Sequence, residues 1–340
     1  MKLIKTINKL CLCCMEKHDV QIVEVHEHNT FKGKNVEYVA TYEYCELTEE
    51  YLATEEMITE NDIAMKNAYR EQNHLLTTQD IIGLRNKYEI SQKDLASLLG
   101  WGEKTITRYE GHQVQDMAHD FVLRKIDGDP EWFLELLENG KTKVSQPAYE
   151  RYKARISKAY EEMQDEYLRK SILAQYVQYQ NFPDYCGDTK LNFNKIVDVI
   201  RYFSNSDKMS NLYKVKLMKL LWYADFLAFK KYNHSLTGMV YTAMPMGAVP
   251  IAHKSIIELK GISYEEIEFE NGIGYRFIPS GDESFHSLSQ EDIGILDTIV
   301  NEFGEDTKEQ IVCKMHEEIA YKETQAGSII DYKYAKALKI

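Results

Sequence analysis

The sequence predicts a mainly α-helical protein with small β elements, of the α+β class overall. Apolar residues recur at spacings of three and four over long stretches of the chain, which is the period of amphipathic helices. Alternation of apolar and polar residues, typical of strands, is confined to short segments near residues 21–45, 237–244 and 262–279. At 340 residues the chain is about two to three times as long as a typical domain. Several separate cores are therefore expected.

The composition predicts a protein of the cytoplasm with no membrane association. Apolar residues make up 44% and charged residues 28% of the chain, which is ordinary for globular proteins. No apolar run approaches the ~20 residues needed to cross a bilayer, and the apolar start of the chain is too short for a signal peptide. The net charge is −13, yet residues 78–126 hold seven basic and seven acidic residues. The acidic excess outside this segment predicts a second, basic partner.

Residues 1–70 are expected to form a β-ribbon followed by an acidic linker. Alternation on both sides of the turn-like segment 32–35 is typical of a two-stranded antiparallel hairpin. Cys11 and Cys14 precede this hairpin and Cys45 ends it. Folding of the hairpin would bring the three thiols together, as in a zinc ribbon.

The sequence allows this cysteine cluster to be either free of metal or a zinc site. Thr48 stands where a fourth cysteine would complete a zinc ribbon. We therefore predict a ribbon that has no cofactor and is held by the packing of its apolar side chains. The alternative is a zinc site whose fourth ligand is Cys13, His26, His28 or another group. A disulfide is disfavoured in the reducing cytoplasm.

Residues 71–140 are expected to form an all-α domain centred on three short helices. Ser91 is placed to cap the second of these helices, and Gly100 can end it in a left-handed conformation. The third helix, from about residue 103 to residue 109, follows within three residues. This short connection is the geometry that lays a helix in the major groove of DNA.

The outward-facing side chains of the second and third helices suit contacts with DNA. The start of the second helix can meet a phosphate, and the third helix can reach phosphates and base edges, where an arginine can bond to guanine through two atoms. We predict that DNA is contacted by Gln92, Lys93, Lys104, Thr105, Thr107 and Arg108.

The motif that runs from Ala96 through Leu99–Gly100 to residues 105–111 resembles the Xre/Cro-type helix-turn-helix. The order of ribbon, acidic linker and helical domain over about residues 8–138 resembles the MqsA-type antitoxins. That resemblance implies a DNA-binding N-terminal half with a structural zinc, and this chain departs from the family in its missing fourth cysteine.

Residues 141–190 are expected to form a long linker helix that ends in a loop at residues 181–188. An apolar, mainly aromatic stripe follows this helix at spacings of three and four, and something must cover it. A neighbouring domain or the same helix of a second protomer would serve, so we expect a homodimer or a higher oligomer. The stripe consists of Tyr149, Tyr152, Ile156, Tyr160, Met163 and Tyr167.

Residues 191–340 are expected to form an α+β domain. Two amphipathic helices lead to a short strand, a loop rich in proline and glycine, and a hairpin with a tight turn at Asn271–Gly272. The segments KLMKLLWYADF, LTGMVYTAMPMGAVP and SIIDYKYAKAL, together with His316, are similar to the Panacea domain, also called the SocA-like domain. The similarity covers about residues 192–338.

The resemblance to the Panacea domain implies that the C-terminal domain binds a toxin. We expect exposed side chains around Tyr241, Met244 and Met246, suited to a basic and partly apolar partner. The candidate toxin-binding residues are Trp222, Asp225, Tyr241, Met244, Met246 and His316.

No set of residues predicts an enzyme. Cys186 and Cys313 lack a sequence context that points to an activating base, and Asp225 is expected to be a buried, hydrogen-bonded carboxylate. The sequence has no phosphate loop, no dinucleotide fingerprint and no His-Glu-x-x-His metal helix. We therefore expect no catalytic residues.

Taken together, the resemblances imply the antitoxin of a type II toxin–antitoxin system. The Panacea domain would bind and neutralise a protein toxin encoded beside it, and the helix-turn-helix would repress the shared operon by binding double-stranded operator DNA. The alternative is a prophage or host transcription regulator whose Panacea domain acts as an adaptor and delivers a client protein to a protease.

Overall fold

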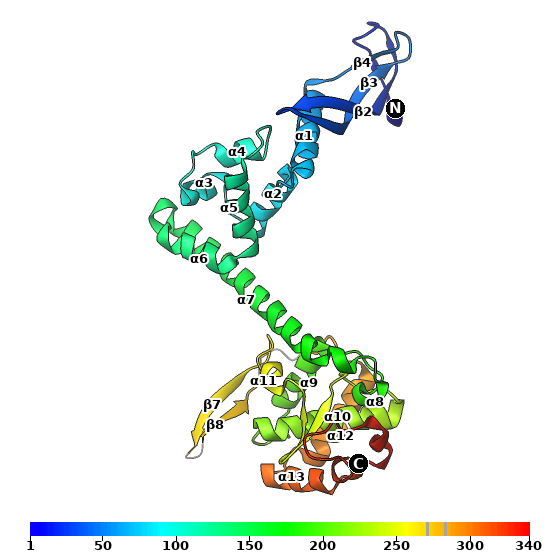
Figure 1. Cartoon of the computed structure of the whole chain (residues 1–340), viewed down its shortest axis with the longest axis vertical. Coiled ribbons are helices and arrows are strands. Elements are labelled where there is room, and N and C mark those ends of the chain that lie inside the picture. The colour runs from blue at the N-terminus through cyan, green and yellow to red at the C-terminus, as the bar shows by residue number, and fades with distance from the viewer. Residues whose placement is uncertain (270–271, 282–283) are drawn as a thin grey trace. The chain divides into compact units, whose positions relative to one another are not determined.

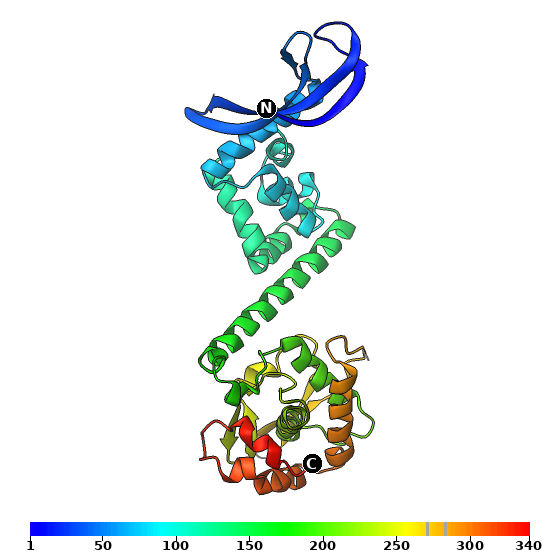
Figure 2. The same cartoon turned by 90° about the vertical axis from the view of Figure 1, so that its right-hand side faces the viewer.

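The structure, a computed structural model, describes residues 1–269, 272–281 and 284–340 and confirms the predicted fold class. Helices dominate, and the strands form small antiparallel sheets (Figures 1 and 2). The chain divides into two compact units, Met1–Glu162 and Met163–Ile340. Each unit has its own buried core.

The N-terminal sheet has four antiparallel strands in the order β1-β2-β3-β4, where two strands were expected. The expected hairpin is present, with Phe31 paired to Lys34 across a turn in which Lys32 and Gly33 have positive φ. Strand β1 was missed because nearly all of its side chains are exposed, so it has no buried face to produce an alternating pattern. The strands are β1 (Lys2–Leu10), β2 (Lys17–Phe31), β3 (Lys34–Cys45) and β4 (Glu50–Leu52).

The acidic segment after the sheet forms helix α1 (Glu55–Gln72), which packs on β3. The Asn61 side chain bonds to both the N–H and the C=O of Thr41, over 2.7 and 2.9 Å. At the other end of α1 the Arg70 side chain is fully buried and all its nitrogens donate hydrogen bonds. Their acceptors are the side chains of Asn67, Thr78 and Gln115 and the carbonyls of Tyr109 and Gln113. This linker is therefore a helix fixed to the helical domain that follows.

Five helices build that domain, and local signals define their ends. The Ser91 side chain accepts from the Asp94 N–H, and Gly100 ends the same helix at φ 70°, as predicted. Asp129 caps the last helix, whose first residue is Pro130. The helices are α2 (Thr78–Lys87), α3 (Gln92–Leu99), α4 (Thr105–Tyr109), α5 (Met117–Gly128) and α6 (Pro130–Asn139), and the short turn η1 (Lys141–Lys143) follows them.

The long helix α7 (Gln146–Tyr176) forms as predicted, over 31 residues. The predicted stripe is covered at its N-terminal end only, and residues beyond its C-terminal end are buried in the other unit. Tyr149 and Tyr152 belong to the core of the N-terminal unit, whereas Ile172 and Tyr176 belong to that of the C-terminal unit. Tyr167, between them, is 77% exposed. The C-terminal core thus includes residues that we assigned to the linker.

Helix α10 (Lys214–Tyr232) runs through the middle of the C-terminal unit (Figures 1 and 2) and is buried almost continuously from Lys216 to Ala228. It packs against α12, α13, β6, η3 and α9. The other elements are η2 (Val177–Tyr179), α8 (Pro183–Cys186), α9 (Phe193–Asn205), β5 (Tyr241–Met244), β6 (Gly247–Pro250), α11 (His253–Ile256), β7 (Tyr264–Phe269), β8 (Gly272–Phe277), α12 (Gln290–Phe303), α13 (Lys308–Glu317), α14 (Ile319–Lys322) and η3 (Tyr332–Ala337).

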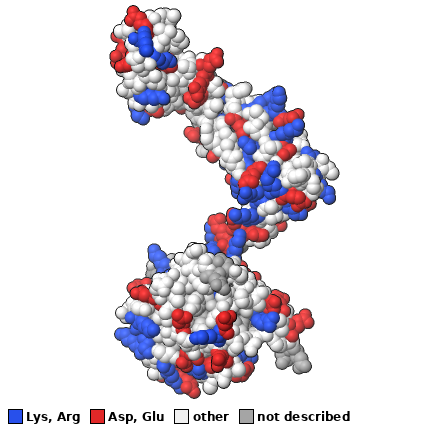
Figure 3. All heavy atoms as spheres, turned by 180° about the vertical axis from the view of Figure 1, so that it is seen from behind, with Lys and Arg blue, Asp and Glu red and all other residues white. Residues whose placement is uncertain are grey.

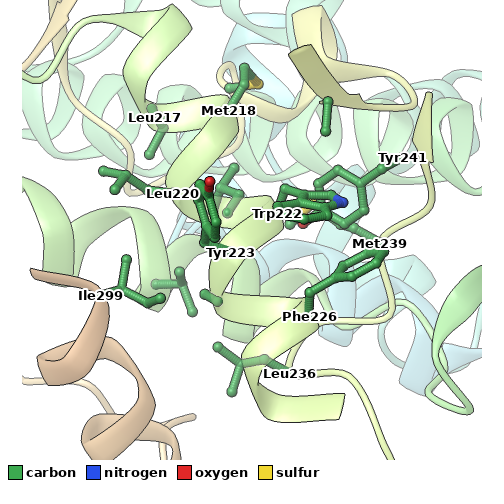
Figure 4. Packing of buried hydrophobic residues seen from close by; sticks show 14 of the residues in the cluster. Leu217, Met218, Leu220, Trp222, Tyr223, Phe226, Leu236, Met239, Tyr241 and Ile299 are labelled. Carbon is green, nitrogen blue, oxygen red and sulfur yellow. The ribbon is translucent and has the colours of Figure 1, made fainter. Parts of the chain in front are cut away.

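Aromatic stacking organises the core around α10. Phe226 stacks on Trp222 with ring centroids 4.3 Å apart and on Tyr332 at 4.4 Å, and Figure 4 shows the surrounding packing. The expected hairpin is present as β7 and β8, which pair up to Phe269 and Gly272. Asn271 of its predicted turn lies outside the described residues.

Candidate functional site

Three cysteines and one histidine converge in the N-terminal sheet. Cys11 and Cys14 lie in the connection between β1 and β2, His18 lies near the start of β2, and Cys45 ends β3. One ligand atom from each of these residues lies within 4.8 Å of all the others. The fourth residue of this cluster is His18, which is none of the three residues that we named from the sequence and belongs to the other groups that we left open. The spacing Cys-x-x-Cys-x-x-x-His was a signal that could have identified it.

Local hydrogen bonds lower the pKa of two thiols in this cluster, Cys11 and Cys45, whereas desolvation raises the pKa of Cys14. Backbone N–H groups, chiefly that of Cys14, lower the pKa of the Cys11 thiol to about 6. A hydrogen bond from the Thr48 side chain lowers the pKa of Cys45. Thr48, which replaces the expected fourth cysteine, therefore supports a neighbouring ligand instead. By contrast, desolvation raises the pKa of Cys13 to about 11, which keeps it a thiol.

This donor set fits zinc. Structural zinc sites take four ligands at tetrahedral positions, and three cysteines with one histidine is a common combination. Cys11 and Cys45 are buried, and Cys13 and Cys14 pack against them. The four candidate ligands thus come from the connection between β1 and β2, the start of β2 and the end of β3, with Cys11 and Cys45 buried and Cys14 and His18 half-buried.

The residues expected to contact DNA lie around α3 and α4. Lys104, Thr107 and Arg108 are exposed, and no ion pair of Lys104 or Arg108 occurs within the described ranges. Gln92 at the start of α3 accepts a 2.8 Å hydrogen bond from the Thr107 hydroxyl and donates to Glu110. This bond ties the first turn of α3 to α4.

Lys93 and Thr105, which were also expected to contact DNA, are less free to do so. Lys93 is exposed and forms a 2.9 Å ion pair with Glu103, across the turn between the two helices. Thr105 is half-buried at the start of α4. Glu110, just after α4, is held by Arg85 through two hydrogen bonds of 2.6 and 3.1 Å. The outward face of α4 therefore carries Lys104 and Arg108. Hydrogen bonds with Gln92 and Arg85 hold the other side of α4 in place.

Three candidates for toxin binding lie in the interior. Trp222, Asp225 and Tyr241 are completely buried, and Figure 4 shows Trp222 and Tyr241 among the packed side chains next to α10. The expected exposure of Tyr241 is therefore wrong. A four-residue strand such as β5 has too few positions for its sequence to show which face is buried.

Asp225 is a structural carboxylate, as expected. It accepts hydrogen bonds from the Thr237 N–H at 2.7 Å, the Thr237 hydroxyl at 2.6 Å and the Tyr241 hydroxyl at 2.6 Å. Desolvation nevertheless raises its pKa to about 6, against the effect of these hydrogen bonds. The network ties α10 to the segment that leads into β5.

The other three candidates share one surface. Met244 and Met246 flank the turn between β5 and β6 and are each 42% exposed. His316 of α13 lines the same cavity as Met246, together with Cys313. The His316 ring stacks on Tyr321, whose hydroxyl donates to the Met244 carbonyl over 2.8 Å. Cys186, the other cysteine considered for catalysis, is buried and donates to the Phe182 carbonyl.

Charge on the surface is mixed. On the face shown in Figure 3, basic and acidic side chains are interspersed over both units. The net charge of −13 therefore does not gather into one large acidic patch on that face. Across the described residues, none of the helices is long and apolar enough to span a membrane.

Comparison with known families identifies one part of the chain. Residues 217–321 match the family model of the SocA-like antitoxins, the Panacea domain. No curated protein matches the chain, and no solved structure matches it either. The matched residues run from α10 to α14 and include the turn between β5 and β6. The C-terminal unit therefore carries a Panacea domain of the SocA-like antitoxin type.

Proposed function

We propose that this chain is the antitoxin of a type II toxin–antitoxin pair, with a toxin-neutralising C-terminal unit and a DNA-binding N-terminal unit. The observation that carries the proposal is the antitoxin-type Panacea domain at residues 217–321. A domain of this type favours a regulatory role over an enzymatic one. The toxin would be a protein encoded beside this chain.

The helical domain supports the second part of the proposal, repression of the shared operon. Helix α4 follows α3 after a short turn and presents Lys104, Thr107 and Arg108 outward. These side chains can bond to phosphates and base edges when α4 lies in the major groove. The five-residue α4 offers few base contacts, so we expect two copies of the chain on a two-fold symmetric operator.

Replacing Lys104 and Arg108 with alanine tests the DNA-binding function. Removing a base contact should weaken binding to the DNA upstream of the gene by about 1–3 kcal/mol, and the wild-type affinity should fall steeply with added salt. The matched control removes two exposed cations of α7, Lys158 and Lys170. Equal affinities of the two double variants in a fluorescence anisotropy titration would exclude α4 as the reading helix.

Co-purification tests the toxin-binding function. The full chain, expressed with the protein encoded by the adjacent open reading frame, should form a stable complex and restore the growth of cells that produce that protein. If the adjacent protein is instead degraded faster whenever this chain is present, the adaptor function becomes the better explanation. Absence of both effects contradicts the antitoxin proposal.

We also propose that Cys11, Cys14, His18 and Cys45 hold a structural zinc ion. The sequence alone favoured a ribbon without metal, because the fourth ligand was missing. His18 completes the set within 4.8 Å, and three thiolates with one imidazole are donors that zinc prefers. When bound, zinc would fix the start of β2 to the end of β3.

A further inference from the structure

Two surface cavities in the C-terminal unit share one lysine. The first, of about 520 Å³, lies between α13 and Met246 of the turn between β5 and β6. The second, of about 530 Å³, lies between the β7–β8 hairpin and the first turn of α10. Lys308, the first residue of α13, lines both cavities. We call the two cavities together the docking groove.

The walls of the docking groove expose large apolar side chains. Met246 is 42% exposed on one wall, and Phe269 and Ile273 are 54% and 56% exposed on the hairpin that forms the other. Exposed apolar groups gathered around a concave surface are typical of protein–protein contact sites. Here Met246 lines the first cavity, and Phe269 and Ile273 line the second.

The turn that carries Met246 is held in place by the core, and Phe269 packs against the backbone of its own hairpin. At Gly247, next to Met246, a side-chain Cβ would lie 2.6 Å from Met315 and 2.8 Å from Lys219, so the turn rests directly on the core. On the hairpin a Cβ at Gly274 would lie 2.6 Å from the Phe269 ring, so the missing side chain leaves room for that ring. A pre-organised surface loses less conformational entropy when a partner binds.

Two lysines, Lys214 and Lys308, form what we call the floor of the docking groove, and Glu309 and Glu317 line its side next to α13. Lys214 and Lys308 are the first residues of α10 and α13, and helix N-termini add partial positive charge. No carboxylate of the described residues forms an ion pair with Lys214. In the part of the chain that the structure describes, the one ion pair of Lys308 is a 3.6 Å contact with the neighbouring, exposed Glu309.

Further charges lie near this floor. Lys219, buried under the turn, donates to the Ala248 carbonyl over 3.0 Å and has no ion pair within the described part of the chain. Two glutamates line the cavity next to α13, Glu309 and Glu317, and the second is paired with Lys339 over 3.2 Å. Among the described residues Lys214 therefore forms no ion pair, although Glu258 attracts its charge and Lys254 repels it. Lys308 has only its weak pair with Glu309 in that part of the chain.

We propose that the docking groove is the surface that binds the toxin, and that the toxin inserts an apolar segment carrying an acidic side chain. The carboxylate would lie over Lys214 and Lys308, and the apolar side chains beside it would pack on Met246, Phe269 and Ile273. Charge complementarity favours this partner, because an acidic group would meet two lysines at helix N-termini, neither of which has a close ion pair among the described residues. The inference rests on the proposed antitoxin function and deepens it. It also differs from the basic partner that the net charge suggested.

Charge reversal in the full chain tests this inference against the protein encoded by the adjacent open reading frame. The double variant Lys214→Glu, Lys308→Glu should raise the Kd for that protein at least about tenfold, measured by isothermal titration calorimetry. The matched control reverses two exposed lysines elsewhere in the unit, Lys322→Glu and Lys336→Glu, and should stay within about twofold of the wild type.

A second variant keeps the test decisive if the charge-reversed protein fails to fold. Phe269→Ser with Ile273→Ser changes only exposed apolar side chains of the hairpin and should also weaken binding, with DNA binding and melting temperature retained. Unchanged affinity in both groove variants overturns the inference, while a wild-type complex still supports the antitoxin function. Tighter binding of the charge-reversed variant would show that the inserted segment of the toxin is not acidic, and this would overturn the inference. If the wild-type chain forms no complex at all, the antitoxin function itself fails.

Discussion

Replacing Tyr241 with phenylalanine should lower the melting temperature of the C-terminal unit without altering the surface. The Tyr241 hydroxyl is buried and donates to Asp225 over 2.6 Å. A hydrogen bond to a charged group contributes about 1.5–3 kcal/mol, and no water can replace it in the interior. In a unit of this size, ~1 kcal/mol shifts the melting temperature by roughly 2–4 °C. We therefore expect a fall of about 3–12 °C at neutral pH.

Differential scanning calorimetry of the full chain measures this shift, and Tyr264→Phe is its matched control. Tyr264 donates to Glu258 over a similar distance, 2.7 Å, but this bond is exposed to solvent, so its loss should cost less than about 1 kcal/mol. Equal shifts in the two variants would refute the reasoning from burial. Loss of toxin binding by Tyr241→Phe at an unchanged melting temperature would show that Tyr241 contacts the toxin directly.

Three further predictions concern groups outside the docking groove. The folded state holds a proton on Asp225 up to pH about 6, whereas the unfolded chain loses it near pH ~4. As pH rises between these values, the stability of the wild type should fall relative to Asp225→Asn, by up to about 3 kcal/mol at neutral pH. Arg70→Lys should cost about 2–4 kcal/mol in urea unfolding, because one ammonium cannot replace the five guanidinium hydrogen bonds. The exposed control Arg124→Lys should cost less than about 1 kcal/mol. His18→Ala should reduce bound zinc from about one equivalent to well below it, while His28→Ala retains it, by elemental analysis. Zinc-free wild-type protein, or full zinc in His18→Ala, would contradict the metal site.

The helix ends were predictable because local contacts define them. Ser91 bonds to an N–H three residues later, and Gly100 needs only its own left-handed conformation. Such signals lie within one turn of the chain and can be found without knowledge of the tertiary fold. The long helix α7 was predictable for a similar reason, since its periodic stripe has no interruption.

The functional surfaces depend on tertiary contacts and were harder to predict. His18 lies four residues after Cys14, but Cys45 joins them only because the strand register places the end of β3 beside the start of β2. Tyr241 and Met246 are five residues apart, yet the first is buried and the second exposed. The docking groove joins Lys214 to Lys308, which are distant in the sequence. The periodicity of a single segment cannot predict a surface that is assembled from residues distant in the sequence.

The most direct test of the antitoxin proposal is a growth assay with the two units expressed separately beside the adjacent open reading frame. The C-terminal fragment should begin at residue 163, because Ile172 and Tyr176 of α7 are buried in the core of that unit. We predict that residues 163–340 restore growth without repressing the promoter, and that residues 1–162 repress it without restoring growth. Growth restored by residues 1–162 but not by residues 163–340 would assign toxin neutralisation to the N-terminal unit and contradict the account.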